Sequence, residues 1–268
     1  MIRTPYRISF FGGSTDRREW YRQHGGAVLA SSISLGVTHE LVGGKIVTTH
    51  DVPPGSGLGA SSADTVGKLR LKFALEQQPV TPMELARMAM RIEQDVRKEC
   101  VGSQDQVMAA HGGFRLVRFR QDDRIDVSTI DPGNLHDYLL LFDTGIRRNS
   151  SEVAKTYTFE RRAMMRFLGM VDEACLILES GPIEDFGRLL DEAWELKRSL
   201  SPLVSSPEID RYYAIAMETG ATGGKVLGSG GGGHILFFAP RHRHVDIIAA
   251  LGMLEHRHFS LDCRCNFG

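Results

Sequence analysis

Three closely spaced glycines and two serines indicate the chemistry of this sequence. They lie in the run 53–63, PPGSGLGASSA, where the glycines free the backbone to wrap around an anion before a helix begins. Backbone N–H groups of such a loop bind phosphate together with the positive end of the helix, and serine hydroxyls reach a phosphate oxygen or its Mg²⁺. We therefore predict a nucleotide site formed by Pro54, Gly55, Ser56, Gly57, Leu58, Gly59, Ala60, Ser61 and Ser62.

Neither standard phosphate-binding motif describes this run. A Walker A loop requires Gly-Lys followed by Ser or Thr, and the dinucleotide motif requires Gly-x-Gly-x-x-Gly. The alternative is an ordinary loop, because clusters of Gly, Ser and Pro most often form loops. Two further runs favour a binding site, since each joins glycines to an apolar strand: TPYRISFFGGSTD at 4–16 and GGKVLGSGGGGHILFF at 223–238.

Taken in chain order, the three runs resemble the motifs of the GHMP kinases, the superfamily of galactokinase, homoserine kinase, mevalonate kinase and phosphomevalonate kinase. The resemblance implies an α+β fold of two domains with the active site in the cleft between them. Residues 1–135 would carry the phosphate loop, and residues 136–268 the third motif, in which Gly230 and Gly231 close over the phosphates. It also implies ATP and Mg²⁺ as cofactors.

Shorter segments resemble one branch, the D-glycero-D-manno-heptose 7-phosphate kinases: GGSTD at 12–16, RIEQDV at 91–96, GSQDQ at 102–106 and WELKRSL at 194–200. This resemblance implies ATP-dependent phosphorylation of the anomeric hydroxyl of the heptose 7-phosphate to the 1,7-bisphosphate, for nucleotide-activated heptose. Ser14 departs from the branch pattern, which has glycine there, and His234 replaces a bulky apolar residue. A galactokinase- or fucokinase-like enzyme and an inactive sugar-phosphate-binding regulator are the alternatives.

Phosphoryl transfer needs positioning, neutralisation of charge and a group that receives the hydroxyl proton. The resemblance gives Asp105 the last role and places Arg7 beside it, where a guanidinium stabilises the carboxylate and the developing charge. The alternative for Asp105 is a cap on a helix that begins at Gln106.

The resemblance also implies that Glu93 and Ser61 hold Mg²⁺, with Ser62 as an adjacent candidate. Hydroxyl and carboxylate oxygens suit this hard, mostly hydrated cation. A salt-bridged glutamate on the surface is the alternative for Glu93.

The sugar site implied by the resemblance contains a glycine turn and an acid. Gly12, Gly13 and Ser14 form the turn, and the carboxylate of Asp16 accepts hydrogen bonds from the two hydroxyls of a vicinal diol. Cations are needed for the phosphate of the sugar itself. The candidates, each of which could instead be a solvated surface residue, are Arg147, Arg148, Lys197 and Lys225.

Composition agrees with a soluble enzyme that acts on small molecules, but does not identify it. The sequence has 268 residues, with 32 Lys plus Arg and 33 Asp plus Glu, so no basic field attracts nucleic acid or an anionic membrane. No apolar segment approaches the ~20 residues of a membrane helix, and no signal peptide is evident, so we expect a cytoplasmic protein. Sugar phosphate and ATP are the expected partners, and a homodimer remains open.

Periodicity predicts the elements that position these residues. Strands are expected at 27–35, 37–42, 45–50, 136–142 and 235–238, and helices at 151–180, 183–200 and 207–219. Ser61 begins a helix that turns Val66, Leu69 and Phe73 inward, and a capping box at 81–84 begins another that extends towards Arg97. In the second helix we expect Met88, Ile92 and Val96 to face the core, with Glu93 at the edge of that stripe.

Two features do not fit the family pattern. GHMP kinases usually contain further strand and helix material between the segments VGG at 42–44 and KIV at 45–47, and it helps to house the adenine. Either a compact variant holds the base differently, or the natural protein contains a segment that this sequence lacks. In addition, HRH at 242–244, HRH at 256–258 and CRC at 263–265 offer metal ligands, but their spacing differs from that of usual zinc sites, so we favour exposed helix ends and a frayed tail.

Overall fold

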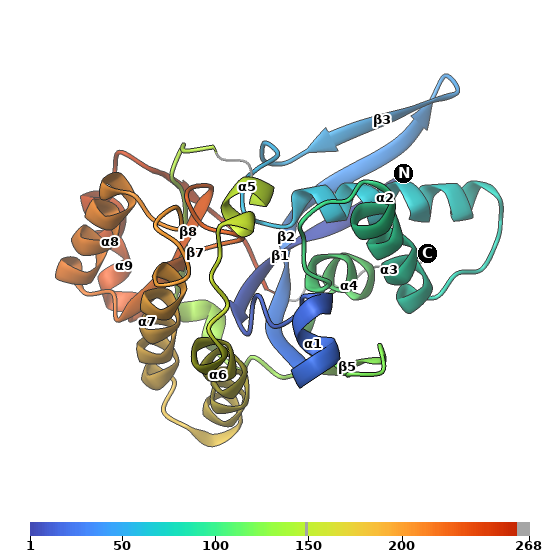
Figure 1. The fold of residues 1–268 in the computed structure, drawn as a ribbon. Helices are drawn as coiled ribbons and strands as arrows, with labels where there is room; N and C mark the ends of the chain where they lie inside the picture. The colour runs from blue at the N-terminus through green and yellow to red at the C-terminus, as the bar shows by residue number, and fades with distance from the viewer. Residues whose placement is uncertain (148–149, 262–268) are drawn as a thin grey trace.

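Two antiparallel sheets form the framework of the computed structural model, which describes residues 1–147 and 150–261 (Figure 1). The N-terminal sheet has the order β1-β2-β4-β5 with β3 beside β2, and its strands are β1 Ile2–Phe11, β2 Gly26–Val42, β3 Lys45–His50, β4 Phe114–Phe119 and β5 Ile125–Thr129. The C-terminal sheet has the order β7-β8-β6-β9, with β6 Leu139–Asp143, β7 Gly223–Val226, β8 His234–Phe238 and β9 Glu255–Arg257.

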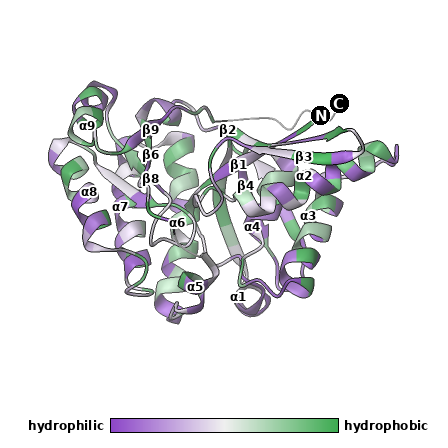
Figure 2. Ribbon diagram, turned by 90° about the horizontal axis from the view of Figure 1, so that it is seen from above, coloured by the Kyte–Doolittle hydropathy of each residue, from purple (hydrophilic) through white to green (hydrophobic). Residues whose placement is uncertain are grey.

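Helices cover both sheets, so the fold is α+β (Figure 2). The N-terminal half contains α1 Arg18–His24, α2 Ala60–Leu75, α3 Pro82–Met90, a π-helix Arg91–Val96 and α4 Gln104–His111. The C-terminal half contains α5 Ser150–Lys155, α6 Arg161–Ser180, α7 Glu184–Arg198, α8 Pro207–Thr219 and α9 His244–Ala250. The expected helix at 151–180 is therefore interrupted, because α5 ends at Lys155 and α6 begins at Arg161.

One aromatic cluster joins the two halves. The ring of Phe186 in α7 lies 5.6 Å from that of Phe10 and 5.1 Å from that of Phe11, both in β1. The same ring stacks on Phe238 of β8 at 6.1 Å. All four rings are buried, so apolar packing fixes the N-terminal sheet relative to the C-terminal one. The domain boundary at 135/136 remains a prediction, because the main core includes residues from both sides of it.

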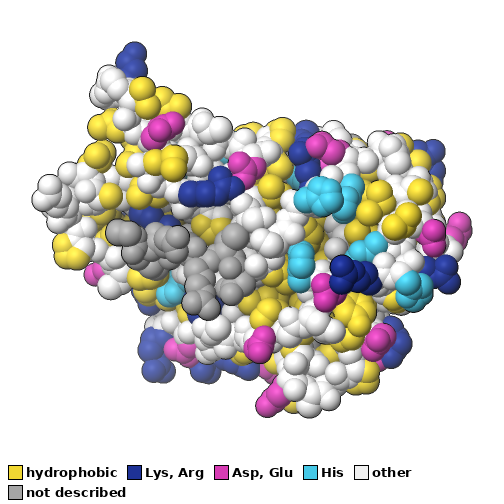
Figure 3. Space-filling model, turned by 180° about the vertical axis from the view of Figure 1, so that it is seen from behind, with side chains coloured by type: hydrophobic (Ala, Val, Ile, Leu, Met, Phe, Trp, Pro, Cys, Tyr) yellow, Lys and Arg dark blue, Asp and Glu magenta, His cyan; other side chains and the backbone are white. Residues whose placement is uncertain are grey.

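A two-residue turn connects β2 and β3 in a hairpin. Val42 pairs with Lys45, and Gly43 and Gly44 between them have φ of 57° and 78°. Positive φ at both central residues suits a type I′ turn, which matches the twist of the strands. The hairpin projects from the molecule (Figure 1), and Leu41, Val42, Ile46 and Val47 near its tip are exposed. Figure 3 shows apolar side chains at the projecting upper left corner of the molecule.

The expected orientation of the helix at 82–97 is wrong at its C-terminal end. Val96 is 72% exposed, whereas Leu85, Ala89 and Glu93 are fully buried. These three residues recur at i, i+4 and i+8, so they lie on one face of the helix. A hydrophobicity pattern does not identify this face, because alanine is small and glutamate is charged. Glu93 therefore lies at the centre of the buried face, not at its edge.

Two absences concern only the described ranges. There, no helix is long and apolar enough to cross a membrane. In the same part of the chain, no group of three or more His, Cys, Asp or Glu side chains is arranged to hold a metal ion. The candidate ligands Cys263 and Cys265 lie outside the described residues.

Candidate active site

The predicted phosphate loop, residues 53–59, lies between β3 and α2 and packs against the glycine-rich loop between β7 and β8. A Cβ on Gly57 would lie 2.7 Å from the carbonyl oxygen of Leu227, and one on Gly228 would lie 2.8 Å from Cα of Gly57. Both glycines have positive φ, 79° and 67°. The N–H of His234 donates to the carbonyl of Ser56 at 2.9 Å. Only glycine permits this approach of two backbones, so the glycine-rich loop between β7 and β8 fixes the shape of the loop before α2.

A cavity of about 200 Å³ opens beside this loop, between the N-terminal sheet and the C-terminal half. Most of the predicted site residues line it: Arg7, Gly12, Gly13, Ser14, Asp16, Gly55, Ser56, Gly57, Gly59, Ala60, Ser61, Ser62, Glu93, Asp105, Lys197 and Lys225. Five others do not line it: Pro54, Leu58, Arg147, Gly230 and Gly231. Arg148 lies outside the described residues.

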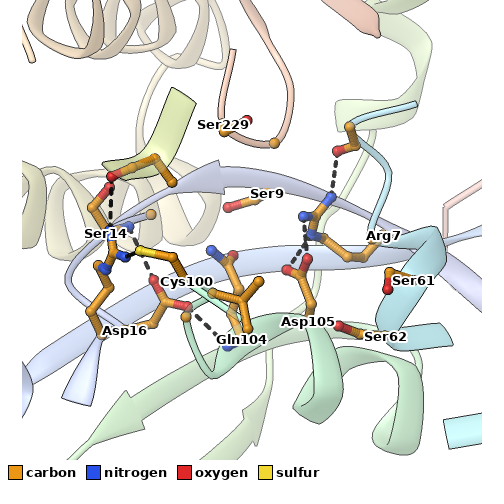
Figure 4. A pocket seen from close by; sticks show the side chains of 18 of the residues that line it. Arg7, Ser9, Ser14, Asp16, Ser61, Ser62, Cys100, Gln104, Asp105 and Ser229 are labelled. Carbon is orange, nitrogen blue, oxygen red and sulfur yellow. Dashed lines mark hydrogen bonds and ion pairs between the residues drawn. The ribbon is translucent and has the colours of Figure 1, made fainter. Parts of the chain in front are cut away.

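Asp105 and Arg7 form a two-pronged ion pair at the loop end of the cavity (Figure 4). Arg7 donates from Nε to Oδ1 at 2.7 Å and from Nη2 to Oδ2 at 2.6 Å, and its Nη1 donates to the carbonyl of Gly57 at 2.6 Å. The side chain of Arg7 is almost wholly buried, whereas that of Asp105 is a quarter exposed and faces the cavity. The guanidinium thus ties the orientation of the carboxylate to the phosphate loop.

The alternative role of Asp105 as a helix cap does not match the structure. Helix α4 begins at Gln104, so Asp105 lies within its first turn. The backbone N–H of Gln104 donates instead to Oδ2 of Asp16 at 3.0 Å, and Oδ1 of Asp16 accepts from the N–H of Ser14 at 3.0 Å. Asp16 is 1% exposed, and burial raises its pKa. Asp16 therefore joins the glycine turn to the start of the helix that carries Asp105.

Glu93 meets Ser62 rather than Ser61. Its Oε2 accepts from Oγ of Ser62 at 2.8 Å and from Nε2 of Gln106 at 2.5 Å, while Ser61 is exposed at the cavity. Burial raises the pKa of Glu93. Its Oε1 is buried and has no hydrogen-bond partner in the described ranges. Glu93, Ser61 and Ser62 line the same cavity, and carboxylate and hydroxyl oxygens are donors that fit Mg²⁺.

Two predicted phosphate-binding lysines are turned towards backbone carbonyls. Lys197 donates to Val226 and Gly228 at 2.8 and 2.7 Å, and Lys225 donates to Phe10 at 2.7 Å. Burial lowers the pKa of Lys197 well below its usual value and that of Lys225 to about 7, and neighbouring cations act in the same direction. These lysines therefore stabilise the walls of the cavity and give it positive charge when protonated.

The remaining candidates lie away from the cavity. Arg147 donates to both carboxylate oxygens of Asp143, the last residue of β6, at 2.7 Å. The carbonyl of Val204 accepts from the N–H of Gly231 at 2.7 Å and would lie 2.8 Å from a Cβ on Gly230. Roles for Arg147, Gly230 and Gly231 in ligand binding remain predictions.

Several lining residues were not predicted: Ser9, Arg17, Cys100, Gln104, Tyr157 and Ser229. Gln104 precedes Asp105 and projects between the two ends of the cavity (Figure 4), and its Oε1 has no partner in the described ranges. Arg17 directly follows Asp16, the last residue of the run 4–16, so its position next to a predicted sugar ligand could have indicated that it lines the site. No sequence pattern indicates Tyr157, which belongs to the C-terminal half and lies between α5 and α6.

Comparison with known proteins agrees with this geometry. The sequence model of the GHMP kinases N terminal domain matches residues 26–113, and that of the GHMP kinases C terminal matches residues 174–251. The D-glycero-alpha-D-manno-heptose 7-phosphate kinase of Campylobacter jejuni is 27% identical, and the alignment covers 92% of this chain and 91% of that protein. Its 310 aligned positions exceed the 268 residues here, so that relative carries segments that this chain lacks.

Solved structures share the fold. A D-glycero-D-manno-heptose 1-phosphate kinase from Bacteriodes thetaiotaomicron superposes with a TM-score of 0.81 at 23% identity, over 98% of this chain and 96% of that one. The Streptococcus pneumoniae phosphomevalonate kinase in complex with phosphomevalonate and AMPPNP gives 0.78 at 14% identity, over 97% and 99%. The chain therefore belongs to the GHMP kinase family, and it is a kinase.

Proposed function

We propose that the protein uses Mg·ATP to phosphorylate the anomeric hydroxyl of D-glycero-D-manno-heptose 7-phosphate, giving the 1,7-bisphosphate. The observation that carries the proposal is the carboxylate of Asp105, which is clamped by Arg7 and faces the cavity beside the phosphate loop. The similarity to the Campylobacter jejuni heptose 7-phosphate kinase along nearly the whole chain supports the choice of sugar.

The nucleotide phosphates would lie against the loop 55–62, where backbone N–H groups and the N-terminus of α2 favour anions. Ser61, Ser62 and Glu93 would hold Mg²⁺. When bound, the cation would neutralise negative charge on the phosphates. The chain's own contribution is to hold these phosphates in line with the acceptor oxygen.

Asp105 would receive the proton of the acceptor hydroxyl. The acceptor oxygen then forms its bond to the γ-phosphorus, and the bond to the β,γ-bridging oxygen breaks, so ADP leaves with the electron pair. Arg7 keeps the carboxylate in place and stabilises the negative charge that develops nearby. Gln104, whose amide oxygen has no partner among the described residues, is placed to accept a hydrogen bond from a sugar hydroxyl between the two ends of the cavity.

The test is turnover with purified protein, ATP and Mg²⁺, measured as ADP release, with the heptose 7-phosphate, galactose, fucose and mevalonate as separate acceptors. The proposal expects turnover with the heptose 7-phosphate and a new phosphorus resonance from an anomeric phosphate. Turnover of galactose, fucose or mevalonate without the heptose phosphate would contradict the choice of substrate. Calorimetric binding of the sugar phosphate with no ATP affinity and no ADP release would identify a regulator instead.

A further inference from the structure

Arg17 is a buried cation in the wall of the cavity. It stands immediately before α1, it is 6% exposed, and it lines the same cavity as Asp105. Its guanidinium lies over the ring of Phe159, 5.1 Å from the centroid, so one of its faces is covered by an aromatic side chain.

The Nη atoms of Arg17 have no carboxylate partner among the described residues. Its Nη2 contacts the thiol sulfur of Cys100 at 2.5 Å, and its Nη1 reaches the carbonyl of Ala154 only at 3.4 Å. Within residues 1–147 and 150–261, its one carboxylate contact is through Nε to Glu19 at 3.1 Å, and the Glu19 side chain is 64% exposed to solvent. Arg7, by contrast, has a carboxylate on two of its nitrogens. A buried guanidinium whose Nη atoms face a thiol and a carbonyl can still bind an anion.

This cation lies at the opposite end of the cavity from the reacting groups. Figure 4 shows Ser14, Asp16 and Cys100 on one side and Asp105, Ser61 and Ser62 on the other, with Gln104 between them. The contact with Cys100 places the Arg17 guanidinium on the first side. An acceptor whose hydroxyl meets Asp105 and whose chain passes Gln104 would extend its far end towards Arg17.

We propose that Arg17 binds the phosphate of the sugar phosphate that is not transferred, and so makes the kinase select phosphorylated acceptors. The inference rests on the proposed function, because it assigns the two ends of the cavity to the two ends of that substrate. The phosphate displaces the thiol of Cys100 from Nη2 and takes a two-pronged contact with the guanidinium. In this proposal Arg17 takes the role that we predicted for Arg147, because Arg147 is already paired with the carboxylate of Asp143.

The first experiment compares the wild type with Arg17→Gln and Arg17→Lys, using the heptose 7-phosphate and the unphosphorylated heptose. Loss of a charge-assisted contact of this kind weakens binding by about 10- to 100-fold, so we expect KM for the phosphorylated sugar to rise by that factor in Arg17→Gln. KM for the unphosphorylated sugar and for ATP should change little, and Arg17→Lys should be intermediate. Arg18→Gln, which removes a surface pair with Asp95, is the matched control and should leave all three values unchanged.

A second measurement needs no variant, so it remains valid if Arg17→Gln fails to fold. Alkylation of Cys100 by iodoacetamide, followed by peptide mass spectrometry, reports occupancy beside Arg17, with Cys175 of α6 as the internal reference. We expect heptose 7-phosphate or high inorganic phosphate to slow modification of Cys100, and the unphosphorylated heptose to do so much less. Equal protection by both sugars, or an unchanged preference for the phosphorylated sugar in folded Arg17→Gln, would overturn the inference. Failure of the wild type to turn over the heptose phosphate, with Cys100 still protected by phosphate, would overturn the proposed substrate and leave the anion site standing.

Discussion

Replacing Asp105 by asparagine tests the reaction at its centre. The amide keeps the size of the carboxylate but cannot accept the proton of the acceptor hydroxyl. Loss of a general base lowers the rate on the order of 10²–10⁴-fold, and we expect kcat to fall by that factor. The affinity for Mg·ATP should change little, because the proposed metal ligands Ser61 and Glu93 are untouched.

The structure adds a second effect of the same substitution, on stability. Arg7 donates to both carboxylate oxygens, at 2.7 and 2.6 Å, and its side chain is almost wholly buried. An asparagine turns its NH₂ group towards one of these donors, so one buried N–H of Arg7 loses its acceptor. Such a loss costs about 1–3 kcal/mol, and we expect the free energy of unfolding to fall by about that amount.

The assay combines three measurements on the Asp105→Asn protein: ADP release at saturating substrates, titration with Mg·ATP, and urea unfolding. The matched control is Asp123→Asn, because Arg22 also donates to both oxygens of Asp123, at 2.9 Å, but on the surface. The control should retain kcat and lose less than about 1 kcal/mol. A folded Asp105→Asn protein with full turnover would refute the role of Asp105 as the base, and one that loses Mg·ATP affinity instead of turnover would make it a metal ligand.

Three further outcomes are expected. Glu93→Gln should weaken nucleotide binding in Mg²⁺ but not in EDTA, measured by paired titrations, since only the metal-dependent part involves its carboxylate; equal loss in both conditions would contradict the metal role. Ser14→Gly should raise the free energy of unfolding by about 1 kcal/mol in urea, because Ser14 has a φ of 80°, where a Cβ is strained; no gain would mean that the hydroxyl compensates. Lys225 has a pKa of about 7 when folded and a usual value of 10.5, so between these values the unfolded chain binds a proton that the folded chain lacks. Stability should therefore rise with pH across that window, and Lys225→Met should flatten the rise in pH-dependent urea unfolding.

The sequence predicted the parts of the site that depend on local backbone. Glycines with positive φ at 55, 57 and 59 form the predicted loop before α2, and the strands at 235–238 and 45–50 are confirmed. A run of glycines constrains conformation within a few residues, so its effect can be inferred without knowing the fold.

The partners of the charged residues could not be inferred in the same way. Arg147 pairs with Asp143 four residues earlier, while Arg17 meets Cys100, and nothing in the residue types distinguishes these outcomes. Glu93 was expected beside an apolar stripe, yet it occupies the buried face itself, because Ser62 and Gln106 supply its hydrogen bonds. Hydrogen bonds and ion pairs between distant segments depend on how the two halves pack together. The residues around one charged side chain in the sequence do not determine that packing.

The hydrogen bonds of the site explain why three separated motifs are needed to place one carboxylate. Asp16 joins the glycine turn to the start of α4, so its two hydrogen bonds fix the turn relative to the helix that carries Asp105. Arg7 connects Asp105 to the carbonyl of Gly57, and Gly57 in turn contacts the loop at Gly228. A displacement in any of the three motifs would therefore change the position of Asp105, the proposed base, relative to the loop that we propose binds the phosphates, and errors near 1 Å there reduce the rate strongly.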